Sequence, residues 1–204
     1  MPYRIIPNGL TLSRIILALP FFLVAYASAD RPWCHTLALF LFAFIILTDF
    51  LDGRLARRWN AVSLMGKELD PIADKAVVAA AYIVLASLHS NNWLLPVLAF
   101  VLIFRDFLVS LLRGFAARCQ TVIAARQSGK LRTALSLSLA FLLLARIPYR
   151  TTQPPWLLQL PNAIPGVIID AGLWVLLLWT VYSLFDYWRA NRNVVWQVLN
   201  APQG

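Results

Sequence analysis

The sequence predicts an all-α integral membrane protein: a bundle of six transmembrane helices with both termini in the cytoplasm. Hydrophobic residues make up 60% of the chain and charged residues only 13%, and the mean hydropathy is +0.70. This composition is far from that of an average soluble domain. A membrane span needs about 20 mostly apolar residues, and six segments meet this condition. Because no internal repeat divides the chain, we expect one membrane domain over residues 1–204.

The six predicted spans follow one another with short connections. They lie near residues 9–29, 34–58, 67–89, 93–115, 130–147 and 164–188. The first resembles a signal peptide, because Arg4 and Arg14 precede an apolar run that ends in small residues. Five more spans follow it, so we expect an uncleaved helix. Segments 59–66 and 116–129 are predicted inner connections, and four prolines in segment 148–162 predict an irregular outer loop.

The formal net charge of +9 is consistent with either a nucleic-acid partner or an anionic membrane surface. The distribution of the charges distinguishes the two. With cytoplasmic termini, only Arg31, Arg146 and Arg150 fall on the outer side. This asymmetry follows the positive-inside rule and argues against nucleic acid. The remaining fifteen basic residues lie at inner helix ends and loops: Arg4, Arg14, Arg54, Arg57, Arg58, Lys67, Lys75, Arg105, Arg113, Arg118, Arg126, Lys130, Arg132, Arg189 and Arg192.

Four aspartates of a chain with only nine acidic residues fall at helical spacing within 26 residues: Asp49, Asp52, Asp70 and Asp74. The first two are three residues apart and the last two are four apart, so each pair shares one helix face. Charged groups in apolar helices are costly and usually mark a functional site. Carboxylates that face one another repel unless cations lie between them. Mg²⁺ prefers oxygen ligands, and paired ions suit displacement at phosphorus, so the pattern predicts a two-metal site.

Small residues and one arginine accompany these acids. Gly53 and Ala56 follow Asp52 closely, and Gly66 lies four residues before Asp70. They leave room for a ligand, although small residues also let helices pack closely. Arg57 would reach the same inner end, where a guanidinium binds phosphate well; anchoring at the membrane surface is the alternative interpretation.

Basic residues of other spans are expected at the same depth. Arg14 starts the first span, Arg105 and Arg113 finish the fourth, and Lys130 and Arg132 start the fifth. A proton relay would instead distribute acids across the bilayer. The arrangement therefore indicates a pocket near the cytoplasmic interface, open to water-soluble and lipid substrates.

Histidine and cysteine give no sign of a metal or redox site. His35 and His89 lack partners at metal-ligand spacing, and we expect them in solvated outer loops. Cys34 and Cys119 fall near opposite membrane faces, which excludes a disulfide between them. Both are best interpreted as small buried hydrophobic residues.

The acidic motif carries a resemblance to a known family. The pattern D-x-x-D-G-x-x-A-R-x8-G-x3-D-x3-D, present as TDFLDGRLARRWNAVSLMGKELDPIADK, resembles the signature of the CDP-alcohol phosphotransferase family at every position. The resemblance implies a six-helix bundle, a homodimer in the membrane and dependence on two divalent ions, Mg²⁺ or Mn²⁺. It also implies roles for single residues. The metal ligands fall on Asp49, Asp52, Asp70 and Asp74; the general base falls on Asp74; the CDP-binding positions fall on Gly53, Ala56, Arg57 and Gly66.

Further motifs resemble one branch of the family. The stretches 6–14 and 69–75 are similar to the phosphatidylglycerophosphate and cardiolipin synthases, and the stretch 105–133 is similar to the phosphatidylglycerophosphate synthases. The resemblance implies transfer of the phosphatidyl group of CDP-diacylglycerol to sn-glycerol 3-phosphate, which gives phosphatidylglycerophosphate and CMP. From the charge distribution and the small size of the protein, we expect a site at the cytoplasmic face of the cell (inner) membrane. The resemblance covers residues 5–147. One departure is Arg132, where many relatives carry Lys.

Glycerol 3-phosphate is a small dianion that needs several cations. The candidate residues for its phosphate are Arg105, Arg113, Lys130 and Arg132, followed by Arg118. A structural ion pair between Arg105 and its neighbour Asp106 is the alternative interpretation.

Two other functions stay open on the sequence alone. A cardiolipin synthase would use phosphatidylglycerol as its acceptor, and this lipid favours a more apolar pocket. A proton-coupled transporter would carry polar groups across the whole membrane depth. Asp170 in the sixth span is the main polar group of that kind, and it has no obvious partner in the sequence.

Overall fold

A computed structural model describes the backbone over residues 5–29, 31–59, 64–118, 127–146 and 164–199, and the side chains over 16–29, 31, 33–48, 75–116, 127–146 and 164–192. No strand occurs in these ranges. Six helices do, as predicted: α1 (Ile5–Ala27), α2 (Pro32–Trp59), α3 (Leu64–Leu88), α4 (Leu94–Arg118), α5 (Gln127–Ala145) and α7 (Gly166–Leu199).

The ends of the first five helices agree with the predicted spans within four residues, whereas the last helix is longer than its predicted span. Helix α7 continues eleven residues beyond the predicted end at residue 188. The prediction followed the apolar run, but backbone hydrogen bonds also continue a helix through polar residues. Asn191 interrupts α7 with φ −112° and ψ 16°, and its side-chain amide donates a 2.8 Å hydrogen bond to the Tyr187 carbonyl.

Among the residues whose side chains are described, three helices are long and apolar enough to cross a membrane. Their apolar parts are Leu94–Ala116 in α4, Gln127–Ala145 in α5 and Gly166–Arg192 in α7. Shorter apolar runs, Ile16–Ala27, Trp33–Thr48 and Lys75–Leu88, lie in the other three helices over the residues whose side chains are described. Large apolar side chains such as Phe40, Phe100 and Leu178 are about two-thirds exposed, as expected for a surface that contacts lipid.

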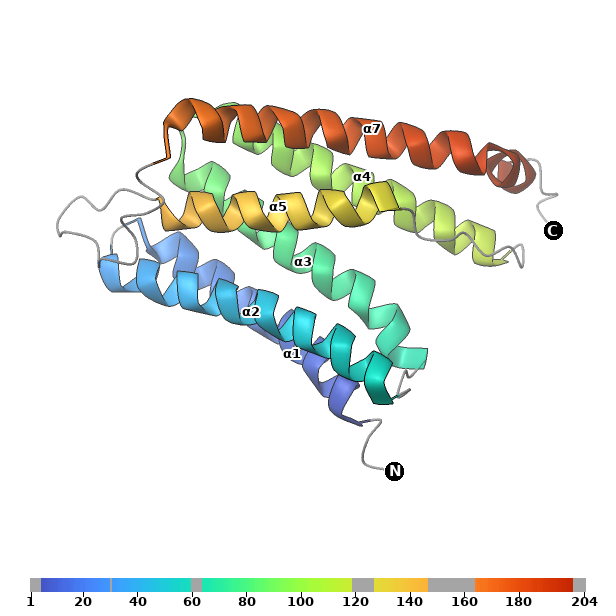
Figure 1. Ribbon diagram of the computed structural model, residues 1–204, viewed down its shortest axis with the longest axis horizontal. Helices are drawn as coiled ribbons and strands as arrows, with labels where there is room; N and C mark the ends of the chain where they lie inside the picture. The colour runs from blue at the N-terminus through green and yellow to red at the C-terminus, as the bar shows by residue number, and fades with distance from the viewer. Residues whose placement is uncertain (1–4, 30, 60–63, 119–126, 147–163, 200–204) are drawn as a thin grey trace.

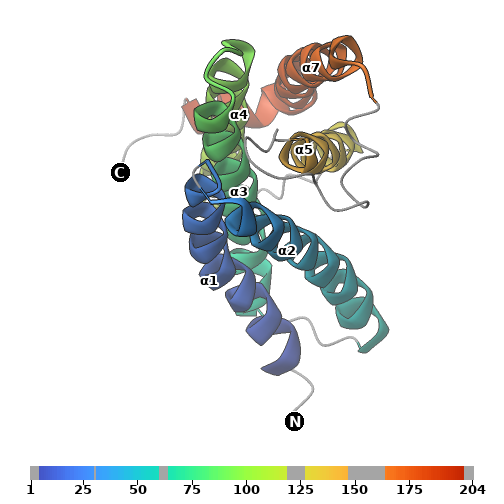
Figure 2. The same ribbon diagram turned by 90° about the vertical axis from the view of Figure 1, so that its left-hand side faces the viewer.

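The helices form two groups that α3 and α5 join (Figures 1 and 2). Helix α1 packs against α2 and α3, while α4 and α5 pack against α7. Helix α3 also contacts α4 and α5. The rings of Phe21 and Phe42 stack between α1 and α2 with centroids 5.1 Å apart. Between α3 and α5, the Tyr82 hydroxyl donates to the Ser136 carbonyl at 3.0 Å.

The helix direction alternates along the chain, which brings alternate helix ends together. Figure 1 shows the starts of α1, α3 and α5 and the ends of α2, α4 and α7 towards the right-hand side of the molecule. The acidic motif spans the end of α2 and the start of α3. Arg113 of α4 and the basic residues at the start of α5, Lys130 and Arg132, therefore lie towards the same end of the bundle as this motif, whereas Arg105 lies near the middle of α4.

The opposite end of the bundle corrects two expectations. Asp170 has a partner, because the Asn92 side-chain amide donates to its carboxylate at 3.3 Å. His35 is not in a solvated loop: it lies in α2 and is only 2% exposed. Hydropathy located both residues near a helix start but gave no information on which helix face they occupy.

Candidate functional site

A cavity of about 180 Å³ lies where α3, α4, α5 and α7 meet. This volume is below the range of about 300–1,000 Å³ that is common for drug-sized ligands, so the cavity suits a small molecule. All four predicted phosphate-binding residues line it. The lining residues are Lys75 and Val78 of α3; Arg105, Asp106, Val109, Ser110 and Arg113 of α4; Ser128, Gly129, Lys130, Arg132 and Thr133 of α5; and Tyr187 of α7.

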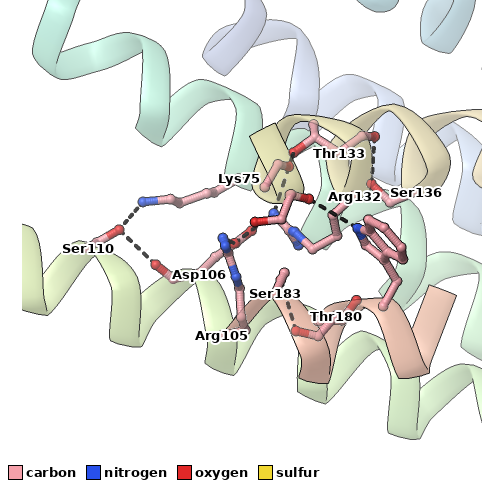
Figure 3. A network of polar contacts seen from close by, with 12 residues as sticks. Lys75, Arg105, Asp106, Ser110, Arg132, Thr133, Ser136, Thr180 and Ser183 are labelled. Carbon is pink, nitrogen blue, oxygen red and sulfur yellow. Dashed lines mark hydrogen bonds and ion pairs between the residues drawn. The ribbon is translucent and has the colours of Figure 1, made fainter. Parts of the chain in front are cut away.

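One carboxylate in the cavity wall pairs with two guanidinium groups (Figure 3). Asp106 Oδ1 accepts hydrogen bonds from Arg105 Nη1 at 3.1 Å and from Arg132 Nη2 at 2.8 Å. All three side chains are buried. The structural ion pair considered for Arg105 therefore exists. Since one negative charge faces two positive charges, the cluster keeps an excess positive charge next to the cavity.

Several buried donors in the cavity wall have no hydrogen-bond partner among the described residues. They are the Nε atoms of Arg105, Arg113 and Arg132, the Nη1 atom of Arg132 and the hydroxyl of Tyr187. An unpaired buried donor costs about 1–3 kcal/mol, and more when it is charged. A ligand that accepts hydrogen bonds and carries negative charge would remove this cost. The wall therefore has the chemistry of an anion site.

Lys75 is a cavity residue that was not among the predicted site residues. Its ammonium group donates a hydrogen bond to the Ser110 hydroxyl, which in turn donates to the Asp106 carbonyl at 2.7 Å. The available signal was its position directly after Asp74, near the middle of α3. Lys75 is therefore the one cavity residue that directly follows the acidic motif.

The start of α5 also faces the cavity, through Ser128, Gly129 and Lys130. The first N–H groups of a helix have no partner within the helix and favour anions. Two contacts with α7 hold this end in place: Ser128 Oγ donates to an Asp186 carboxylate oxygen at 2.9 Å, and Trp179 Nε1 donates to the Ser128 carbonyl at 3.1 Å. Partial positive charge from the helix end is thus added to that of the basic side chains.

The metal-binding and CDP-binding candidates lie in helices, as predicted, but their side chains are outside the described residues. Asp49 and Asp52 are in α2, and Asp70 and Asp74 are in α3. The helical backbone keeps each acid pair on one face, and carboxylate oxygens are the donors that Mg²⁺ and Mn²⁺ prefer. The donor set therefore fits the predicted ions. The remaining candidates in these two helices are Gly53, Ala56, Arg57 and Gly66.

The chain connection keeps the two acidic helix ends near each other. Four residues separate Trp59, the last residue of α2, from Leu64, the first residue of α3. Five Cα–Cα steps span at most about 19 Å. The end of α2 and the start of α3 thus lie at the same end of the bundle, in agreement with their positions in Figure 1.

Known proteins are similar to this chain along nearly its whole length. Three similar proteins are each named CDP-diacylglycerol–glycerol-3-phosphate 3-phosphatidyltransferase. The one from Pectobacterium atrosepticum is 33% identical over 92% of this chain and 95% of its own length. The one from Bacillus subtilis is 34% identical over 95% and 96%, and the one from Shigella flexneri is 35% identical over 92% and 94%. Residues 4–186 match the CDP-alcohol phosphatidyltransferase family model, and the chain therefore belongs to this family.

Proposed function

We propose that this protein transfers the phosphatidyl group of CDP-diacylglycerol to sn-glycerol 3-phosphate, which gives phosphatidylglycerophosphate and CMP. The observation that carries the proposal is the small cavity with five basic side chains and unpaired buried donors. The names of the relatives agree with this donor and acceptor.

Charge and size favour glycerol 3-phosphate over a lipid acceptor. Arg105, Arg113, Lys130 and Arg132 come from two helices and line one cavity, so the phosphate dianion has basic groups on more than one side. Lys75 is a fifth such group. Phosphatidylglycerol carries one negative charge and two acyl chains, and a cavity of about 180 Å³ with this lining suits it poorly.

The acidic motif is proposed to hold the nucleotide end of the donor. Asp49, Asp52, Asp70 and Asp74 are the ligands for two divalent cations. When bound, these ions neutralise the diphosphate charge and assist the departure of CMP. Gly53, Ala56, Arg57 and Gly66 surround the cytidine diphosphate.

The chain's own residues then position the acceptor and move its proton. The cavity residues hold the phosphate of glycerol 3-phosphate, so that its free primary hydroxyl is directed towards the donor. Asp74 takes the proton of this hydroxyl. The hydroxyl oxygen forms a bond to the phosphorus that carries diacylglycerol, and the bond from that phosphorus to the CMP oxygen breaks. Transfer of this kind depends mainly on positioning and charge neutralisation.

The proposal includes the membrane arrangement. Six spans with both termini in the cytoplasm agree with fifteen basic residues on the inner side against three on the outer side. This orientation exposes the cavity and the acidic motif to the cytoplasm, where glycerol 3-phosphate is available, in the inner membrane of a cell. A homodimer is the proposed assembly.

The experiment is a CMP-release assay with purified protein, CDP-diacylglycerol and one acceptor at a time. We expect CMP and phosphatidylglycerophosphate with glycerol 3-phosphate, loss of both with EDTA and recovery with Mg²⁺. Asp70→Asn should abolish turnover, whereas Asp170→Asn, at the opposite end of the bundle, should retain it. Consumption of phosphatidylglycerol alone would overturn the assignment of the acceptor.

A further inference from the structure

Tyr187 is a buried cavity residue from a helix that carries no recognised motif. It lies in α7, is 2% exposed and lines the cavity. Its hydroxyl has no hydrogen-bond partner among the described residues. The guanidinium carbon of Arg113 lies 5.8 Å from the centre of its ring, within the range of a cation–π contact.

The unpaired hydroxyl contrasts with comparable groups nearby. Tyr82 is equally buried, and its hydroxyl donates to the Ser136 carbonyl at 3.0 Å. Within α7, the Thr180 hydroxyl donates to the Leu176 carbonyl at 2.7 Å, and the Ser183 hydroxyl donates to the Thr180 carbonyl at 2.9 Å. Buried tyrosine hydroxyls usually find a partner. The missing partner of Tyr187 is therefore expected to come from a ligand in the cavity.

We propose that Tyr187 is a specificity-determining residue, whose hydroxyl donates a hydrogen bond to the acceptor phosphate and whose ring positions Arg113 against the same group. This inference rests on the proposed function. A phosphate oxygen is the favoured partner because the unpaired groups around the cavity are donors. A phosphate dianion supplies acceptors alone, whereas a glycerol hydroxyl would also add a donor.

Tyr187→Phe tests the hydroxyl while it keeps the ring. The matched control is Tyr182→Phe in the same helix, whose side chain is 54% exposed and does not line the cavity. We expect Tyr187→Phe to raise the KM for glycerol 3-phosphate about tenfold, in the range of a hydrogen bond to a charged group. The KM for CDP-diacylglycerol should stay unchanged, and Tyr182→Phe should change neither KM.

A second variant separates the ring from the hydroxyl. Tyr187→Leu removes both, so we expect a larger increase in the KM for glycerol 3-phosphate than with Phe. If Phe behaves as the wild type and Leu alone is impaired, the ring positions Arg113 but the hydroxyl has no role, and the proposal is overturned.

A binding measurement distinguishes this inference from the proposed function. Inorganic phosphate should raise the melting temperature of the wild type, and the rise should be smaller for Tyr187→Phe. In the absence of phosphate, Tyr187→Phe should be at least as stable as the wild type, because it removes an unpaired buried group. Equal phosphate shifts in both proteins contradict the role of Tyr187. If the wild type releases no CMP with glycerol 3-phosphate but the phosphate shifts differ, the proposed function fails and the phosphate contact stands.

Discussion

Asp106 is the acidic residue on which the cavity wall depends. Its Oδ1 atom accepts hydrogen bonds from both Arg105 and Arg132, and no other acidic side chain lines the cavity over the described residues. Two guanidinium groups buried among apolar helices would repel each other without it. Asp106 thus holds both arginines in place while it leaves other nitrogen atoms of each one unpaired.

Asp106→Asn should destabilise the protein and impair turnover. Removal of one partner of a buried ion pair costs about 3–5 kcal/mol, so we expect the free energy of unfolding to fall by about 3 kcal/mol. An SDS titration from a mild detergent would measure it. Asp170→Asn is the matched control, because the exposed carboxylate of Asp170 bonds only to Asn92 among the described residues. An effect no larger than that of this control would contradict the role of Asp106.

The sequence predicted the basic residues of the cavity but not the aromatic residue that lies beside them, Tyr187. The depth of Arg105, Arg113, Lys130 and Arg132 follows from hydropathy, and the structure brings all four to one cavity. Tyr187 was missed because an aromatic residue near a membrane surface is ordinary there. Its significance depends on which way α7 faces, and hydropathy measures depth along a helix but not rotation about its axis.

At the scale of elements, the start of α5 lies close to Arg105 of α4 and is hydrogen-bonded to α7 through Ser128. Gly129 lies in its first turn, and a Cβ atom there would be 3.3 Å from Arg105 Nη2. Arg105 is held by Asp106 at 3.1 Å and can move little. The absence of a side chain at Gly129 therefore lets the helix end approach the arginine closely.

Gly129→Ala should raise the KM for glycerol 3-phosphate about threefold through displacement of Arg105, with a smaller change in the KM for CDP-diacylglycerol. Gly114→Ala is the control: it lies in α4, is exposed, and a Cβ atom added there would meet nothing within 4 Å. That substitution should add about 0.5–1 kcal/mol of stability through helix propensity and leave both KM values unchanged. Steady-state kinetics of the two variants would check this. If the KM of Gly129→Ala for glycerol 3-phosphate equals that of Gly114→Ala, a side chain at position 129 does not displace Arg105.

The order and number of helices could be predicted more securely than their ends. Apolar runs located the six helices of the described ranges, because a helix that crosses a membrane needs a long apolar run. The end of α7 was missed since Arg189 and Asn191 are polar, and polarity ends an apolar run without ending a helix. Of the acidic motif, the structure confirms helical positions, and the shared metal site stays a prediction.

At the scale of the whole molecule, the alternating helix directions bring the end of α2 and the start of α3, which carry the acidic motif, to the same side of the bundle as the end of α4 and the start of α5 (Figure 1). The motif belongs to α2 and α3, whereas the cavity is lined mostly by α4 and α5. Helix α3 contributes to both: Asp70 and Asp74 belong to the acidic motif, and Lys75 lines the cavity.

Reporter fusions test the proposed orientation of this end. A tag at either terminus should be cut by added protease in inside-out membrane vesicles and protected in right-side-out vesicles, because positive charge is retained in the cytoplasm. A tag inserted in the predicted outer loop, residues 148–162, should give the opposite pattern. Protection of one terminus in inside-out vesicles would exclude an even number of spans.

The sharing of Asp106 by two arginines has a consequence for how the acceptor binds. The guanidinium groups of Arg105 and Arg132 leave water when the protein folds, so a phosphate that enters the cavity does not have to strip or reorient them. The free-energy cost of desolvating and orienting the two arginines is therefore met when the protein folds and not when phosphate binds. More of the free energy of each hydrogen bond to phosphate then contributes to affinity and alignment. Detergent-solubilised enzyme should therefore become markedly more heat-resistant once phosphate is added.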